Sequence, residues 1–273
     1  MVQHYSSIKA WELWNEPSQG VFFSGTPEEY AALARIASTE LKAVDSEALL
    51  VVGGFTATEV DWQLAAARAG ALGVADVISF HFASDVPPAV AGGFPAYLKE
   101  LKALTARFRG LAANTTQNPN PRLWNTEGGT MDTSLLTNMP LEVGLPPSHC
   151  LSPPSYTRGA QSIVQAEAAM QYLGLEKHFI YLQNGEQLTE KSTLYENTNM
   201  LDINNSPRPK LISRLNFAAQ TDGAVLPPIL LNATTLPSPL LWAFVFAETH
   251  PERSLGKVCC FVSKQRSCVK LKL

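Results

Sequence analysis

Apolar and polar positions in this chain fall into two alternating patterns. Continuous apolar runs rich in β-branched or aromatic residues predict strands at 8–14, 49–52, 77–82, 122–126 and 178–183. Apolar residues at helical spacing predict helices near 26–44, 60–72, 98–108, 156–173 and 207–218. Strands that alternate with long helices are typical of an α/β protein with a parallel sheet, either an open doubly wound sheet or a closed barrel.

Local signals support these elements. Thr26-Pro27-Glu28-Glu29 is a capping box with proline at the first helical position, so a helix should begin there. Gly53-Gly54 closes the second predicted strand, and Gly174 should end the fourth helix.

The pattern of the sequence changes after about residue 224, where β segments interrupted by proline replace the alternation of strands and helices. We therefore divide the chain into a barrel-like domain at 1–223 and a β-rich segment at 224–273, such as part of a β-sandwich. A hairpin is expected from 257–262 and 267–273. Cys259 or Cys260 could pair with Cys268 across it, and a buried free thiol is an equal alternative.

Composition and charge exclude several classes of protein. The chain has 273 residues, of which 45% are hydrophobic and 16% charged, as in an ordinary globular protein. Its net charge is −3, which gives no electrostatic attraction to nucleic acid or to an anionic membrane. The longest apolar runs, such as 240–247, are too short to span a bilayer. The cysteines lack CxxC spacing and the histidines are scattered, so we expect no metal.

Two glutamates stand at the carboxyl ends of predicted strands, the face on which barrel enzymes carry their active sites. Glu16 follows the first strand and Glu127 the fourth. Cleavage of a glycosidic bond needs one carboxyl group that donates a proton and a second, ionised one that attacks or stabilises the anomeric centre. The pair fits that requirement.

The residues around both glutamates resemble known motifs. Trp-Glu-Leu-Trp-Asn-Glu-Pro at 11–17 is similar to the acid/base segment on strand four of clan A glycoside hydrolases, and Trp-Asn-Thr-Glu-Gly at 124–128 resembles their nucleophile segment on strand seven. Leu-Asp-Ile-Asn at 201–204, followed by Arg-Pro-Lys at 208–210, resembles the stretch after strand eight in families 39 and 5, while the family within the clan stays open. The resemblance implies that Glu16 is the acid/base, Glu127 the nucleophile, and Asn15 a contact to the 2-hydroxyl of the sugar. It implies no cofactor, and carboxyl groups about 5 Å apart.

The same register implies a (β/α)8 TIM barrel of which this chain holds strands four to eight. Glu16 and Glu127 are 111 positions apart with two strand-helix units between them, as expected for a path from strand four to strand seven. Only ten residues precede Trp11, so we expect the chain to begin partway through the barrel and to be poorly soluble or inactive as it stands.

Further residues are candidates for binding the substrate. His81 could orient a sugar hydroxyl or the acid/base, or be a satisfied histidine near the core. Trp14 could stack on a sugar face, and Gln183 lies where strand eight would face the substrate. Glu12 shares a strand face with Glu16 and is expected to form structural hydrogen bonds. Ala83 stands where many clan members have a tyrosine that supports the nucleophile.

We expect a retaining glycosidase that acts on an oligosaccharide or glycoside. The alternative is a catalytically inactive, carbohydrate-binding remnant of such an enzyme, and transglycosylation would use the same carboxylates. The motifs do not select among xylose, glucose, mannose, a uronic acid or a glycolipid. The loop at 131–155 could cover a substrate groove or be a plain connector. Three N-glycosylation triplets weakly favour a secreted protein.

Overall fold

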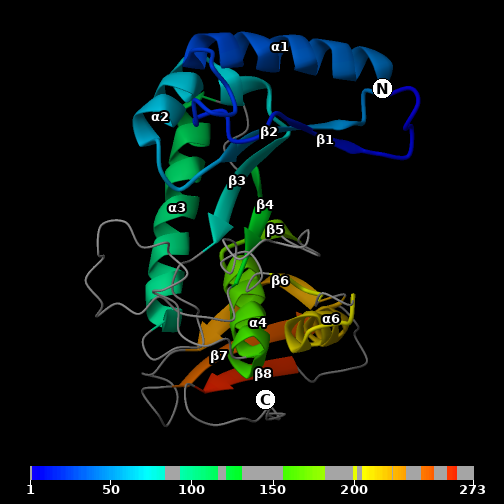
Figure 1. Ribbon diagram of the computed structural model, residues 1–273, viewed down its shortest axis with the longest axis vertical. Helices are drawn as coiled ribbons and strands as arrows, with labels where there is room; N and C mark the ends of the chain where they lie inside the picture. The colour runs from blue at the N-terminus through cyan, green and yellow to red at the C-terminus, as the bar shows by residue number, and fades with distance from the viewer. Residues whose placement is uncertain are drawn as a thin grey trace. The chain divides into compact units, whose positions relative to one another are not determined.

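The computed structural model describes residues 2–83, 93–115, 121–130, 156–181, 199–201, 205–222, 224–231, 241–248 and 257–262. The chain forms two compact units (Figure 1). The first unit holds Met1–Phe82, Leu101–Gly128 and Leu175–Phe179. The second holds Ala83–Glu100, Gly129–Gly174 and Ile180–Leu273.

Five strands form one sheet in the order of the sequence, β1-β2-β3-β4-β5. They are Ala10–Leu13, Leu49–Phe55, Val77–Ala83, Arg122–Gly129 and Leu175–Ile180. β1 pairs parallel with β2, and β2 with β3. An open doubly wound sheet reverses its strand order at a switch point, whereas a barrel does not. The observed order has no reversal, so the α/β prediction is confirmed and the order is that of a barrel.

The sheet is strongly curled. Strands in a flat sheet lie about 4.8 Å apart, which would place β1 and β4 about 14 Å from each other. The Glu12 side chain of β1 nevertheless accepts a hydrogen bond of 2.7 Å from the Thr126 hydroxyl of β4. One glutamate side chain is too short to cross a flat sheet, so the strands must bend around a concave face onto which both side chains project.

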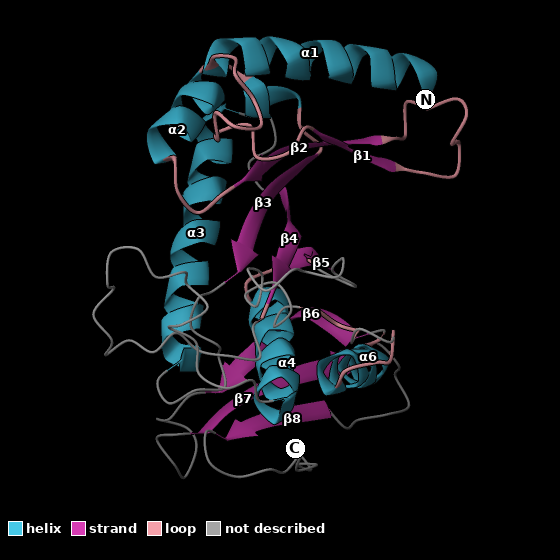
Figure 2. Cartoon of the chain, viewed as in Figure 1, coloured by secondary structure: helices cyan, strands magenta, loops and turns pink. Residues whose placement is uncertain are grey.

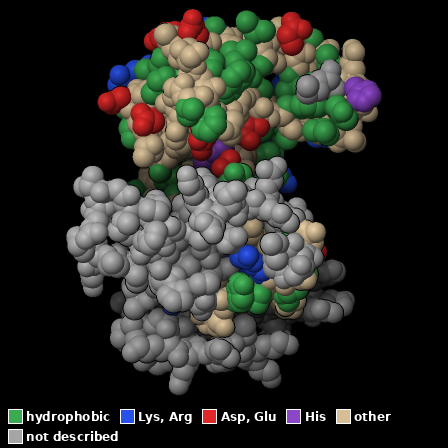
Figure 3. All heavy atoms as spheres, in the orientation of Figure 1, with side chains coloured by type: hydrophobic (Ala, Val, Ile, Leu, Met, Phe, Trp, Pro, Cys, Tyr) green, Lys and Arg blue, Asp and Glu red, His purple; other side chains and the backbone are tan. Residues whose placement is uncertain are grey.

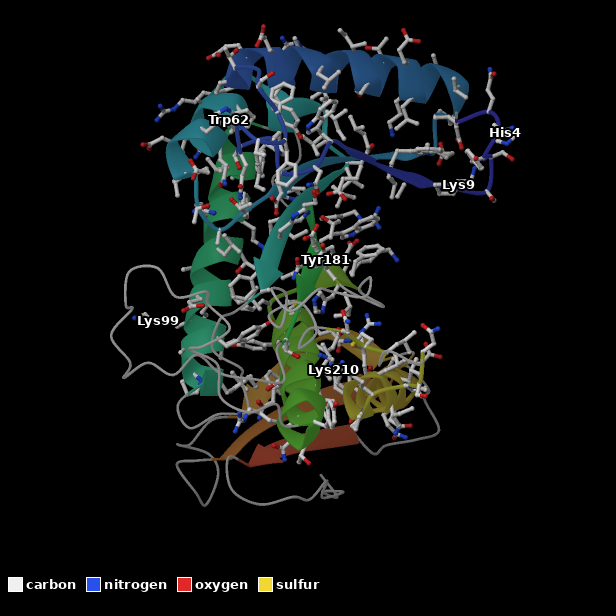
Figure 4. All side chains as sticks on the ribbon, in the orientation of Figure 1. His4, Lys9, Trp62, Lys99, Tyr181 and Lys210 are labelled. Carbon is white, nitrogen blue, oxygen red and sulfur yellow. The ribbon has the colours of Figure 1, made fainter. Side chains whose placement is uncertain are left out.

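Helices α1 (Pro27–Val44), α2 (Val60–Arg68) and the later part of α3 (Gly93–Thr115) belong with this sheet (Figure 2). An aromatic cluster joins them to it. Phe108 of α3 stacks on Phe55 of β2 and on Phe80 of β3, with ring centroids 5.8 and 5.3 Å apart. Trp62 of α2 packs against Phe55 and Tyr30 (Figure 4). These rings bury a large apolar area and hold the helices to one side of the sheet.

The predicted start of α1 is confirmed. The Thr26 hydroxyl accepts from the backbone N–H of Glu29, and the Glu29 carboxylate accepts from the backbone N–H of Thr26. The predicted helix at 60–72 is confirmed over 60–68 and wrong over 69–72, because α2 ends at Arg68 and a separate 3₁₀ helix, η1, covers Ala71–Val74. Gly70, with φ of 93°, breaks the run by adopting a left-handed conformation.

Strand β5 begins earlier than predicted. Gly174 ends α4 (Tyr156–Tyr172) with φ of 74°, and the strand starts at the next residue. The start of β5 could not be predicted from the apolar pattern, because Glu176 and Lys177 are polar. In the fold Glu176 forms an ion pair of 2.6 Å with Arg122 of the neighbouring strand β4. Residues 182 and 183, the predicted end of the strand, lie outside the described residues.

The second unit contains a three-stranded antiparallel sheet of β6 (Ala224–Leu231), β7 (Leu241–Glu248) and β8 (Lys257–Val262). Helix α4 packs against both β6 and α6 (Pro209–Thr221). An ion pair between Arg214 and Glu167 joins the two helices. The predicted strand at 267–273, with Cys268, lies outside the described residues, as does the loop at 131–155.

Tyr30 provides a test of how α1 is held to the sheet. Its buried hydroxyl donates to the backbone oxygen of Leu13 at 3.3 Å and accepts from the backbone N–H of Gly53 at 3.2 Å. We predict that Tyr30→Phe lowers the free energy of unfolding by about 1–3 kcal/mol, because both backbone groups lose their partner. Chemical denaturation measures the change. Tyr5→Phe, at a half-exposed ring, is the control and should leave stability unchanged; equal effects would contradict the prediction.

Candidate active site

The turn after β1 holds Glu16 in an unusual backbone conformation. Trp14 has φ of 65° and Glu16 has φ of 41°. Both values lie in the left-handed region, which residues other than glycine rarely adopt. Two hydrogen bonds fix the turn: the backbone N–H of Gln19 donates to Glu16, and the Trp14 indole N–H donates to the backbone oxygen of Phe22, each at 2.9 Å. A strained residue persists only where the surrounding structure holds it in place, and such residues cluster at functional sites.

Strand β2 passes beside Glu16 without a side chain in the way. Its register shifts at Gly53 and Gly54. A Cβ on Gly53, which has φ of 141°, would lie 2.1 Å from the backbone oxygen of Ser79. A Cβ on Gly54 would lie 3.4 Å from the Glu16 backbone nitrogen and 3.5 Å from His81 Nε2. The two glycines therefore permit β2 and β3 to approach closely next to the site.

Glu16, His81 and Glu127 converge within the first unit. His81 Nδ1 lies 2.9 Å from Glu16 Oε1 and 3.6 Å from Glu127 Oε2. The three ligand atoms all lie within 4.8 Å of one another. Their side chains are between 9 and 31% exposed, so the group is largely enclosed yet open to solvent on one side. The sequence placed these residues at three strand ends, and the fold brings them together.

Burial raises the pKa of the Glu127 carboxyl. His81 lowers it, while the charges of Glu16 and Glu12 raise it further. The implied role of nucleophile requires Glu127 to be ionised. Its raised pKa runs against that expectation, because the side chain is partly withdrawn from water and shares its space with two other carboxylates.

Asn125 and Gly128 fix the strand that carries Glu127. The buried Asn125 amide accepts from the backbone N–H of Phe82 at 3.2 Å and donates to the backbone oxygen of Phe82 at 3.1 Å. A Cβ on Gly128 would lie 2.4 Å from Asn125 Nδ2 and 2.6 Å from the Phe82 oxygen. Only glycine fits there, one residue after Glu127.

Glu12 and two hydroxyls form a second polar group in the concave face of the sheet. Glu12 Oε1 accepts hydrogen bonds from Ser79 and Thr126. The expectation that Glu12 forms structural hydrogen bonds is met. The sequence reading missed Ser79, Thr126 and Asn125. A polar residue inside an otherwise apolar strand was the available signal, since buried polar groups require partners.

The remaining predicted site residues have different outcomes. Asn15 is exposed beside Glu16, and Trp14 is 51% exposed. Both stay predictions as sugar contacts. Trp124 is 3% exposed and packs in a hydrophobic cluster with Val51 and Val77. Gln183 lies outside the described residues.

Glu16, His81 and Glu127 also form the one group of three acidic, histidine or cysteine residues, in the part of the chain that the structure describes, that could hold a metal ion. The expectation that the protein holds no metal was based on the spacing of cysteines and histidines along the chain. Such spacing does not show which residues the fold brings together. That expectation stays untested.

Acidic and basic side chains are scattered among apolar ones over the described part of the surface seen in Figure 3, in keeping with the small net charge. None of the helices that the structure describes has the length and apolar character to cross a membrane.

Comparisons with known proteins identify the fold. A family 39 glycoside hydrolase from the gut symbiont Bacteroides cellulosilyticus WH2 matches with a TM-score of 0.62 and 16% identity, over 96% of this chain and 49% of that one. AbfB, a family 51 α-L-arabinofuranosidase from Bifidobacterium longum, matches with 0.59 and 14%, over 94% and 54%. A glucosidase from Croceicoccus marinus matches with 0.55 and 13%, over 90% and 51%.

These matches confirm the predicted α/β fold and its resemblance to glycoside hydrolases with a (β/α) barrel. At such low identity they show the fold alone. The chain spans about half the length of the solved structures it matches. No protein-family model and no curated protein matches the sequence.

Gly128 gives a test of the close packing next to Glu127. We predict that Gly128→Ala costs about 1–3 kcal/mol of stability, because the added methyl group overlaps the backbone of Phe82. Gly110→Ala is the matched control. Its Cβ would meet nothing within 4 Å inside helix α3, so it should stabilise the chain by about 0.5–1 kcal/mol. Thermal unfolding of both variants measures these changes. Destabilisation of the same size in both would contradict the close packing assigned to Gly128.

Proposed function

We propose that Glu16 and Glu127 are the catalytic pair of a retaining glycoside hydrolase that cleaves O-glycosidic bonds. One observation carries the proposal: a carboxylate oxygen of each glutamate lies within 4.8 Å of the other, from residues 111 positions apart. Retaining enzymes keep their carboxyl groups about 5 Å apart, whereas inverting enzymes leave about 6.5–9.5 Å for a water molecule. The spacing favours retention.

In the proposed reaction the Glu127 carboxylate attacks the anomeric carbon while Glu16 donates a proton to the departing glycosidic oxygen. The bond from the anomeric carbon to that oxygen breaks, and a glycosyl ester on Glu127 forms. Glu16, now ionised, takes a proton from water, and the hydroxide displaces Glu127. The proton taken from water stays on Glu16, and Glu127 leaves as a carboxylate, so both residues end each cycle as they began. Neither step uses a metal ion or an organic cofactor.

His81 is placed to serve both states of Glu16. A nitrogen of a neutral imidazole can accept a hydrogen bond from a carboxylic acid or, in the other tautomer, donate a hydrogen bond to a carboxylate. The 2.9 Å contact to Glu16 can therefore persist whether Glu16 holds its proton or has given it up. A protonated His81 also lowers the pKa of Glu127 and so favours the ionised form that a nucleophile needs.

The fold neighbours support a sugar substrate. They are described as a glycoside hydrolase, an arabinofuranosidase and a glucosidase, which act on different sugars. We infer that an oligosaccharide or glycoside binds here, with Asn15 and Trp14 as contacts beside Glu16. Gln183 stays a further proposed contact from the strand-eight region.

Trapping of the covalent intermediate tests the proposal directly. The purified chain is incubated with a panel of 2-deoxy-2-fluoro glycosides that carry activated leaving groups and differ in the sugar. The fluorine slows hydrolysis of the glycosyl ester. The ester therefore accumulates even in a chain that is expected to turn substrate over poorly. We predict a mass increase of one glycosyl group on Glu127, located by peptide mapping.

Three variants sharpen this experiment. Glu127→Gln should abolish labelling. Glu16→Gln should retain labelling, because an activated leaving group needs no proton, while turnover of substrates with poor leaving groups falls by about 10²–10⁴-fold. Glu40→Gln, an exposed glutamate on α1, should behave as the unaltered chain does. Binding of glycosides without any labelling across the panel would favour the inactive, carbohydrate-binding alternative. Labelling that persists in Glu127→Gln would refute the assigned nucleophile.

The raised pKa of Glu127 predicts a dependence of stability on pH. A carboxyl with a raised pKa in the folded state binds its proton more tightly there than in the unfolded chain, so its ionisation destabilises the fold as pH rises through that pKa. Glu127→Gln should therefore be more stable than the unaltered chain at pH 7. The difference should vanish below the ordinary glutamate pKa of about 4.3. Denaturation at several pH values measures it, and an advantage that grows in acid would contradict the sign.

A further inference from the structure

Glu12 lies in the first unit and contacts each of the strands that carry the proposed catalytic groups. It belongs to β1, four residues before Glu16. Its Oε1 accepts from Ser79 Oγ of β3, two residues before His81, at 2.5 Å, and from Thr126 Oγ1 of β4, directly before Glu127, at 2.7 Å. One oxygen atom thus joins three strands.

The hydrogen-bond directions in this group are fixed by chemistry. An ionised carboxylate can only accept, so both hydroxyls must donate to Glu12. Distances of about 2.5–2.7 Å are typical of hydroxyl groups that donate to an ionised carboxylate. Because the Ser79 proton points at Glu12, the Ser79 oxygen is left to accept from the backbone N–H of Gly54 on β2, at 2.7 Å. The chain of bonds therefore reaches all four strands from β1 to β4.

The hydrogen bond between Glu12 and Thr126 joins strands that lie far apart in the sheet and in the sequence. β1 and β4 are not neighbours in the sheet, and Glu12 and Thr126 are 114 positions apart in the sequence. The Glu12–Thr126 bond spans the concave face on which Glu16 and Glu127 must also meet. A change in its length would alter the separation of the two catalytic carboxylates.

We propose that Glu12 is a positioning residue of this site, whose ionised carboxylate holds the strands of His81 and Glu127 in place and whose negative charge acts on Glu127. Its part in catalysis rests on the proposed function, whereas its part in positioning does not.

The charge of Glu12 reaches Glu127 together with three other influences. The groups that act on Glu127 are its own burial, His81, Glu16 and Glu12, in decreasing order of effect. Glu12 raises the pKa of Glu127, and its effect is the smallest of the four. A residue that only tied strands together would not change the titration of Glu127, so titration separates the two roles.

The experiment titrates the glutamate carboxyl groups of the full chain by carbon NMR with ¹³C-labelled glutamate. Glu127→Gln identifies the resonance of Glu127 by its loss. In Glu12→Gln the amide oxygen can still accept both hydroxyls while the charge is gone, so the pKa of Glu127 should fall. In Glu40→Gln the pKa of Glu127 should stay where it is in the unaltered chain. An unchanged Glu127 titration in Glu12→Gln would overturn the proposal.

A double-mutant cycle tests the positioning. Thr126→Val removes the hydroxyl and keeps the branched shape, and Glu12→Ala removes the acceptor. If one hydrogen bond joins them, the loss of stability in the double variant should be smaller than the two single losses combined. Losses that add fully would overturn the proposal. Should Glu12→Ala fail to fold, Glu12→Leu, which has no acceptor but keeps more of the side-chain volume, completes the cycle with Thr126→Val. Neither measurement depends on turnover, so a negative trapping experiment would refute the proposed function and leave this result standing.

Discussion

The curvature of the five-stranded sheet is the constraint on which the site depends. In a flat sheet β1 and β4 would be about 14 Å apart, and neither the pair Glu16 and Glu127 nor the pair Glu12 and Thr126 could meet. Two observations show how the curl is accommodated. The glycines at 53 and 54 let β2 press against β3, and the aromatic stack of Phe55, Phe108 and Phe80 fills the space between sheet and helix. The curvature of the sheet, the close approach of β2 to β3 and the meeting of Glu16 with Glu127 therefore depend on one another.

The electrostatics of the site follow from the same crowding. Three carboxylates and one histidine share a small volume, and in such a group the carboxyls cannot all be ionised without cost. His81 contacts both groups, with Nδ1 2.9 Å from Glu16 Oε1 and 3.6 Å from Glu127 Oε2. Glu127 is the group whose pKa is raised, through its burial and its acidic neighbours. A bound sugar would withdraw the site further from water and so strengthen each of these interactions.

Much of this arrangement could be predicted from sequence, because strand ends and helix caps are local signals. The capping box at Thr26 and the strand ends at Glu16, His81 and Glu127 were predicted at the right places. The break at Gly70 and the early start of β5 at Leu175 were not, since tertiary contacts such as the Glu176–Arg122 pair outweigh local polarity. Contacts between distant strands, above all those of Asn125 with Phe82 and of Thr126 with Glu12, cannot be read from spacing in one chain.

The long reach of the Glu12–Thr126 bond has a consequence for the order of folding. Contacts between residues 65 to 114 positions apart close only after the intervening chain has been drawn together, and such non-local contacts slow folding. The helix at Pro27–Val44 and its neighbouring strands can collapse on short loops. The cluster of Glu16, His81 and Glu127, by contrast, needs β4 to dock, so we expect it to form late in folding and to be lost when the sheet opens.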